Sequence, residues 1–212
     1  TFPILGGNSA VTGAFSIDNS LRFNDGDSAY LSRTPSTAGN RKTWTWSAWI
    51  KRGKIGSRQI LFSADNNATD ATYFMLELQA DDNLRCLAGS EGGSATCVKE
   101  TSMVLRDTNS WYHIVFKFDA TNATAVFYVN GQEITDYNST TNPSNQNFQV
   151  NATTQHFLGR FGSSLGTSYF DGYMAEVNFV DGQALDASYF GYTESQTGLW
   201  RPKRYEGTYG TN

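Results

Sequence analysis

The stretch Trp111-Tyr112-His113-Ile114-Val115-Phe116-Lys117-Phe118-Asp119 decides the fold class of this chain. Large apolar residues occupy every second position from Tyr112, which is the period-two pattern of a β-strand that buries one face. The expected inner face consists of Tyr112, Ile114, Phe116 and Phe118, and the expected outer face of His113, Val115 and Lys117.

A β-hairpin is expected directly after this strand. Ala125–Val129 is another β-rich run, and the dipeptide Asn130-Gly131 closes it. Asn-Gly suits a two-residue type I′ turn, because both central residues of that turn need positive φ. Glu133-Ile134-Thr135 is then the returning strand.

Further short strands lie on both sides of this hairpin. Trp44–Lys51 alternates in the same way, and Phe170–Phe179 is the longest later run, with Gly172 indicating a close backbone approach or a bulge. Only Ala184–Phe190 has a helical pattern. Many short strands with almost no helix predict an all-β fold, a two-sheet antiparallel jelly-roll sandwich. The expected core includes Trp44, Trp46, Ile50, Ile114, Phe116, Phe118, Val177 and Phe179.

The bulk composition excludes several function classes. The 212 residues fit one large domain, and aromatic residues make up 14% of them, which can fill a sizeable core. The sequence contains no run of about twenty apolar residues, so it predicts no membrane insertion. A net charge of −4 without a basic block argues against nucleic-acid binding.

Two cysteines, Cys86 and Cys97, flank a Gly-rich segment that has the character of a hairpin tip. Facing strands would bring them within range of a disulfide bond, and their near-symmetric placement about Gly92-Gly93 favours that pairing. The alternative is a pair of buried free thiols.

The two ends of the chain lack strand periodicity. We expect an extended arm over residues 1–17, the sandwich over residues 18–192 and an irregular tail over residues 193–212. Both ends carry apolar or aromatic residues, which would be costly to expose, so we expect them to contact neighbouring subunits rather than complete this domain's core. The expected assembly contacts are Phe2, Ile4, Leu5, Trp200, Tyr205 and Tyr209.

Four segments in the second half resemble the laminin-G-like branch of the concanavalin-A-like jelly rolls. They are Trp111–Asp119, Phe127–Gln132, His156–Arg160 and Phe170–Phe179, in that order and spacing. The resemblance extends from Leu21 to Gly191 and implies a β-sandwich that binds a ligand more often than it catalyses a reaction.

Acidic residues near the expected first hairpin, Leu21–Phe23 with Ala29–Leu31, are candidates for a structural calcium site. Asp25 and Asp27 lie in its turn, and Glu176 lies in the closing strand. Calcium prefers several carboxylate and carbonyl oxygens. Two departures from the family weaken such a site: Ser28 or Ala29 stands where a second acid often follows Asp27, and Ala175 stands where an Asp often precedes Glu176. The alternative is an ordinary solvated turn.

A narrower resemblance covers nearly the whole chain. Leu31–Ser47, Phe170–Gly182 and Thr197–Asn212 are similar to segments of tailed-phage virion proteins that are described as tail-fibre-like or structural. This implies a virion location, partners among other virion proteins and copies of the same chain, and a role in attachment or surface decoration. The rival interpretation is a secreted carbohydrate-binding module of a cellular protein.

The sequence predicts binding rather than catalysis. It contains no strand with Glu-x-Asp-x-x-Glu, the paired carboxylates that some jelly rolls use to cleave β-glucans. His113 has no recognisable nucleophile turn, so Trp111 and His113 are interpreted as structural, with His113 hydrogen-bonded between the sheets. The glycan-binding candidates are aromatic residues outside the expected core, which could equally contact a protein partner: Trp49, Tyr137, Phe161, Tyr169 and Tyr173.

Overall fold

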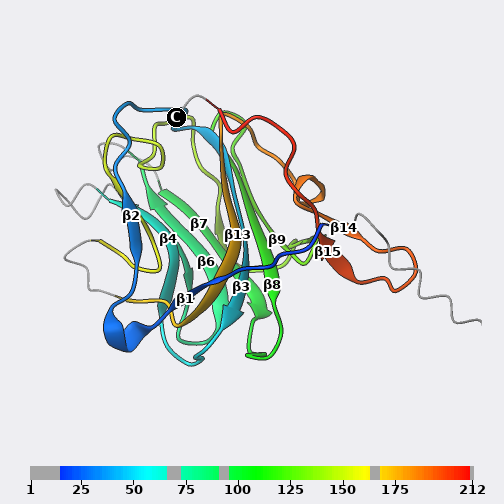
Figure 1. Cartoon of the computed structure of the whole chain (residues 1–212). Coiled ribbons are helices and arrows are strands. Elements are labelled where there is room, and N and C mark those ends of the chain that lie inside the picture. Colours follow the sequence, from blue (N-terminus) through cyan, green and yellow to red (C-terminus); the bar gives the residue numbers. More distant parts are fainter. Residues whose placement is uncertain (1–14, 66–72, 91–95, 163–167, 211–212) are drawn as a thin grey trace, which may run out of the picture.

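The computed structural model describes residues 15–65, 73–90, 96–162 and 168–210. Most of its strands form two antiparallel sheets that pack face to face (Figure 1). Sheet A has, in spatial order, β1 (Leu21–Phe23), β13 (Gly172–Asp181), β3 (Thr43–Arg52), β8 (Tyr112–Asp119), β9 (Thr124–Val129) and β10 (Gln132–Glu133). Sheet B has β11 (Tyr137–Thr141), β7 (Thr96–Val104), β6 (Asn83–Gly89), β5 (Tyr73–Leu78), β4 (Gln59–Asp65), β12 (Gln155–Leu158) and β2 (Leu31–Arg33). The all-β sandwich prediction is confirmed.

Aromatic side chains fill the space between the sheets. The Trp44 ring stacks on Phe118 of the neighbouring strand at 4.9 Å and meets Phe74 of sheet B edge-on at the same centroid distance. β3 and β8 bring these rings together, because their register places Trp44 opposite Phe118 and Trp46 opposite Phe116. Six of the expected core residues are buried as predicted: Trp44, Trp46, Ile50, Ile114, Phe116 and Phe118.

The Asn-Gly hairpin is also confirmed. β9 pairs with β10 across Asn130 and Gly131, whose φ angles are +49° and +79°. The Asn130 side-chain oxygen also accepts a hydrogen bond from the backbone N–H of His113 at 2.8 Å, which ties the turn to β8.

A β-bulge interrupts β13 and overturns one expectation for the core. Ala175 pairs with Trp49 and Asn178 with Ser47, so β13 has one more residue than β3 over this interval. Glu176 accommodates the extra length with φ +47°. The alternation shifts at this point, so that Val177 lies on the same side of the strand as Phe179. Val177, expected to be buried, is nevertheless 37% exposed because it lines a pocket at the edge of the sandwich, and Phe179 is half-buried.

The first expected hairpin does not form. β1 pairs with β13 in sheet A, whereas β2 pairs with β12 in sheet B. The 3-10 helix η1 (Asp25–Asp27), followed by Ser28 at φ +55°, redirects the chain from one sheet to the other. The expected helix at 184–190 is reduced to the 3-10 helix η3 (Ala187–Tyr189).

The C-terminal segment covers the outer face of sheet A. β14 (Gly191–Thr193) and β15 (Trp200–Pro202) form a hairpin beside this sheet (Figure 1). Tyr205 is buried with Val115 and Tyr128 of sheet A, and Trp200 packs against the same cluster. The expectation that Trp200 and Tyr205 do not complete this domain is therefore wrong, because sheet A carries apolar residues on its outer face too.

The other expected assembly residues differ in their placement. Tyr209 remains exposed, with its hydroxyl donating a hydrogen bond to Asn178 Oδ1 at 2.5 Å. Phe2, Ile4 and Leu5 lie outside the described residues.

The cysteine prediction is corrected by the register of β6 and β7. Cys86 lies opposite Lys99, and Cys97 lies opposite Ala88, so the two cysteines are diagonal rather than direct neighbours. Both are free and fully buried. Burial and the neighbouring Cys97 thiol raise the pKa of Cys86 well above its usual value, which keeps it in the unreactive thiol form.

In the described part of the chain, no helix is long and apolar enough to cross a membrane.

Candidate functional site

Aromatic side chains gather on the outer face of sheet A, beside the C-terminal hairpin. Trp49 and Trp111 line a pocket of about 310 Å³ there. We call this pocket the aromatic cleft; its walls are formed by Ile17, Asp18, Asn19, Ser20, Trp49, Trp111, Ala175 and Pro202. The ring of Tyr173 lies next to it, 6.5 Å from the Trp111 ring.

The strand register brings these rings together. Trp49 alternates with the core residues of β3 and therefore points outward, and Trp111 is the residue that precedes β8. Ala175 of β13 lies directly opposite Trp49, and its small side chain leaves space over the indole. Tyr173 lies two residues earlier on the same strand. The Arg22 guanidinium lies over its ring in a cation–π contact, 5.2 Å from the centroid.

His113 supports the floor of the aromatic cleft. Its ring stacks on Trp49, with centroids 4.9 Å apart. Its Nδ1 accepts a hydrogen bond from Trp200 Nε1 at 3.0 Å, so its Nε2–H donates to Ser47 Oγ at 2.9 Å. The expectation that His113 is structural agrees with these contacts, but the bonds link sheet A to the C-terminal hairpin and not to sheet B.

Burial keeps His113 uncharged. Removal from water lowers the pKa of its imidazole from 6.5 to about 3, because burial penalises the charged form. Both ring nitrogens are already engaged, so this histidine has no nitrogen free to act as a general base.

The aromatic cleft combines flat apolar rings with short polar side chains. The indole nitrogens of Trp49 and Trp111 have no hydrogen-bond partner in the part of the chain that the structure describes. Asp18 accepts a hydrogen bond from Ser16 Oγ at 2.8 Å and keeps further acceptor capacity, as do Asn19 and Ser20. Such a surface can stack on an apolar ring face and hydrogen-bond to hydroxyl groups around it.

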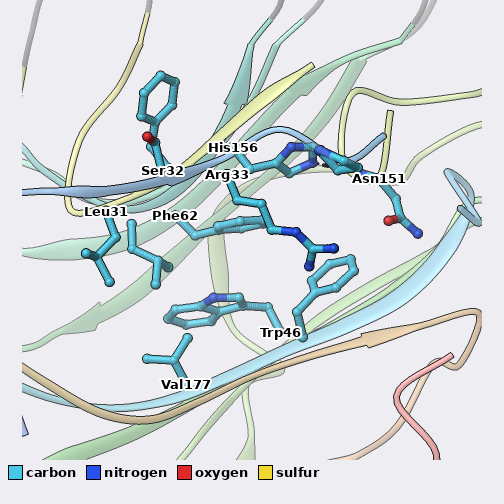
Figure 2. Close-up of a pocket in the computed structure, with 12 residues that line it drawn as sticks. Leu31, Ser32, Arg33, Trp46, Phe62, Asn151, His156 and Val177 are labelled. Atoms are coloured by element: carbon cyan, nitrogen blue, oxygen red, sulfur yellow. Dashed lines mark hydrogen bonds between the residues drawn. The ribbon is translucent and has the colours of Figure 1, made fainter. Parts of the chain in front are cut away.

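A second pocket opens between the two sheets, and we call it the intersheet pocket. It has a volume of about 360 Å³ (Figure 2). Its apolar wall consists of Leu31, Pro35, Trp46, Phe62, Phe157, Leu158, Val177 and Phe179, and its polar wall of Ser32, Arg33, Asn151 and His156. A shallower groove connects the two pockets. It shares Asn19, Ser20 and Ala175 with the aromatic cleft. It shares Leu31, Leu158 and Val177 with the intersheet pocket.

Comparison with known proteins identifies the family. Residues 24–188 match the family described as the concanavalin A-like lectin/glucanases superfamily. The chain belongs to this superfamily. No protein with a curated description matches the sequence.

Several solved structures share the fold of this superfamily member. A proposed carbohydrate-binding protein of Bacteroides ovatus is 19% identical with a TM-score of 0.61, over 89% of this chain and 52% of that protein. A heptameric SAP-like pentraxin from Limulus polyphemus is 15% identical with a TM-score of 0.52, over 81% of this chain and 75% of the pentraxin. The CBM40 of a Ruminococcus gnavus IT-sialidase, bound to α2,3-sialyllactose, is 14% identical with a TM-score of 0.50, over 74% of this chain and 92% of the CBM40 chain. The chain thus spans about half the length of the Bacteroides protein.

The structure places the five glycan-binding candidates in different environments. Trp49 and Tyr173 come together at the aromatic cleft with Trp111, which sequence reasoning had assigned to a structural role. Phe161 is fully buried against Ile60 and Met75 on the outer face of sheet B, so its candidacy is wrong.

The other two candidates are engaged elsewhere on sheet B. Tyr137 packs against the core, and its hydroxyl accepts the backbone N–H of Phe127 at 3.3 Å. Tyr169 is half-buried beside Tyr30 and Arg160, at 5.7 Å from the guanidinium. Neither contributes to the aromatic cleft.

The structure does not assemble the calcium candidates. Leu21 lies opposite Met174 in the antiparallel pair β1–β13, so Glu176 lies towards Asn19 and away from η1. In this register Glu176 is six residues along β13 from the position opposite Asp25, which corresponds to a separation of roughly 20 Å. Asp25 instead pairs with Lys54 at 2.7 Å, a hydrogen bond that lowers the pKa of its carboxyl. The described residues contain no group of three His, Cys, Asp or Glu side chains placed to hold a metal ion.

Proposed function

We propose that this chain is a non-catalytic carbohydrate-binding domain and that the aromatic cleft is its glycan site. The convergence of Trp49 and Trp111 on one pocket, next to Asp18 and Asn19, supports this proposal most directly. The carbohydrate-binding descriptions of the Bacteroides and Ruminococcus proteins, which share the fold, favour it as well.

Binding to immobilised polysaccharides and a glycan array tests the proposal. Replacing Trp111 by Ala removes one ring from the pocket but leaves the core intact, because the residue precedes β8. We expect at least a tenfold loss of affinity, about 1.4 kcal/mol, which is within the range of a single aromatic contact. Tyr192→Ala is the matched control, since Tyr192 is an exposed aromatic residue outside the pocket. Equal binding by Trp111→Ala and the parent protein would place the glycan elsewhere.

The absence of catalysis is part of the proposal. Purified protein should release no reducing ends from laminarin, agar or host polysaccharides, because the sequence has no strand with Glu-x-Asp-x-x-Glu and both ring nitrogens of His113 and His156 are hydrogen-bonded. Release of reducing ends that disappears in Glu176→Gln would show that the domain is an enzyme.

We further propose that the domain works on a tailed-phage particle, as part of a tail fibre or as a capsid-surface decoration that adheres to host or environmental glycan. The resemblance of Leu31–Ser47, Phe170–Gly182 and Thr197–Asn212 to virion segments supports this context. Mass spectrometry of purified particles, with antibody labelling in electron micrographs, tests the location and the copy number. A gene that encodes a signal peptide, in a cellular genome, would instead favour a secreted carbohydrate-binding module.

A further inference from the structure

We propose that the intersheet pocket is a second binding site, for a small amphipathic carboxylate whose apolar body lies between the sheets and whose carboxylate binds Arg33. The pocket and the aromatic cleft share no lining residue, so this proposal does not depend on glycan binding. Three features of the pocket support the proposal: it opens at the edge between the sheets, its interior is apolar, and the Arg33 guanidinium has no partner among the described residues.

The pocket exists because the sandwich does not close along this edge. β1 and β2, the outermost strands there, have three residues each. The bulge at Glu176 places Val177 on the same side of β13 as Phe179, and both side chains line the pocket. The space is therefore lined by residues of both sheets and opens at their edge.

The interior is apolar and aromatic. Trp46 and Phe62 form its floor as stacked rings 6.2 Å apart, one from each sheet. Leu31 and Val177 flank the opening, and they are 50% and 37% exposed although they are large apolar residues. A ligand with an apolar body would cover these side chains and exclude water from them.

The polar wall contains one charged side chain, and it has no partner among the described residues. His156 Nε2 accepts the backbone N–H of Asn151 and its Nδ1–H donates to the Thr154 carbonyl, both at 2.9 Å. The Asn151 amide donates to Asp181, which is buried behind it and does not line the pocket. Arg33, in contrast, has no ion-pair or hydrogen-bond partner for its guanidinium among the described residues.

Arg33 is well placed to receive an anion. Figure 2 shows its side chain extending from β2 over the pocket, with the guanidinium beside Phe62 and Trp46, and Arg33 is an exposed residue. No acidic residue of the described segments lines the pocket, so the wall that they form carries a single positive charge. A guanidinium presents a planar fork of N–H donors that matches a carboxylate in two parallel hydrogen bonds. The combination selects a ligand with one carboxylate at the end of an apolar body.

The volume limits the ligand to a small one. About 360 Å³ lies at the lower end of the range for small-molecule sites, so a medium alkyl chain or a single aromatic ring fits. Octanoate and 4-phenylbutyrate represent these two kinds of apolar body, and octylamine has the chain of octanoate with the opposite charge.

Isothermal titration of the whole chain with these probes tests the proposal. We expect saturable binding of at least one carboxylate, at least tenfold weaker binding of octylamine, and at least a tenfold loss of carboxylate affinity in Arg33→Ala. Arg33→Lys keeps the positive charge without the planar fork of donors, so its carboxylate affinity should lie between that of the parent protein and that of Arg33→Ala. Leu31→Trp adds an indole at the exposed opening and should abolish binding without disturbing the core. Arg204→Ala removes an exposed arginine outside the pocket and should bind as the parent protein does.

Three results would overturn the proposal: no saturable binding of either carboxylate, equal binding of octylamine, or unchanged affinity in a folded Arg33→Ala variant. Circular dichroism of each variant confirms that the fold is retained. Trp111→Ala, which is directed at the aromatic cleft, should bind the carboxylate normally, so that failure of one site is distinguishable from failure of the other.

Discussion

Protonation of His113 should make the stability of this domain depend steeply on pH in mildly acidic solution. Burial holds the pKa of the folded-state imidazole at about 3, whereas the unfolded chain has the ordinary value of 6.5. Between these two values the unfolded state binds more protons than the folded state. Stability is therefore complete above pH 6.5 and is lost as the pH falls towards 3.

The structure sets the size of this effect. Each pH unit within the window removes about 1.4 kcal/mol, so the loss from His113 alone reaches roughly 3 kcal/mol at pH 4.5. That is a large part of the roughly 5–15 kcal/mol that stabilises an ordinary domain. Protonation would also break the hydrogen bond from Trp200 Nε1, because Nδ1 would become a donor.

Urea denaturation followed by tryptophan fluorescence, at several pH values from 7.5 to 4.5, measures this dependence. His113→Gln cannot take up the proton, so its free energy of unfolding should fall much less over the same range. His156 is buried too, and its pKa is lowered for the same reason, but it is present in both proteins and cancels in the difference. Parallel curves for the two proteins would refute the argument and indicate that water reaches the His113 ring.

Three further predictions concern packing. Trp46→Ala should lower the free energy of unfolding by about 3–5 kcal/mol, as measured by urea denaturation, because the residue is almost fully buried at the centre of β3. Gly191→Ala should cost about 1–3 kcal/mol by overpacking, since an added Cβ would lie 2.4 Å from the Trp200 ring, and a thermal shift assay would detect it. Cys86 and Cys97 should not react with a thiol reagent in the native protein and should react fully in denaturant, whereas rapid native labelling would contradict their burial.

The sequence was sufficient to predict the features that depend on neighbouring residues. Alternation in Trp44–Lys51 and in Tyr112–Phe118 predicted the strands and the faces that point into the core, since side-chain direction in a strand has a period of two. It did not predict that His113 and Val115, on the outer face, are buried as well. Asn130-Gly131 predicted its turn because the required φ angles belong to those residues themselves.

Features that depend on distant partners were not predictable in the same way. The symmetric spacing of Cys86 and Cys97 suggested a direct pair, but strand register is set by the whole of β6 and β7. The observed register differs from the symmetric one and places Lys99 opposite Cys86. Trp200 and Tyr205 lack any strand pattern, and only the apolar outer face of sheet A, with Val115 and Tyr128, explains why Tyr205 is buried and Trp200 is half-buried.

The bulge in β13 connects these local and distant effects at the candidate sites. Its extra residue turns Ala175 and Val177 to different surroundings, so Ala175 lines the aromatic cleft and Val177 lines the intersheet pocket. With unbroken alternation, Val177 would point outward as Ala175 does and would not line the intersheet pocket. A single positive-φ residue, Glu176, therefore shapes both pockets, although the alternating pattern of the strand gives no sign of it. Bulges commonly redirect side chains near binding sites, and the local rule fails here at the position where the two candidate sites of this domain meet.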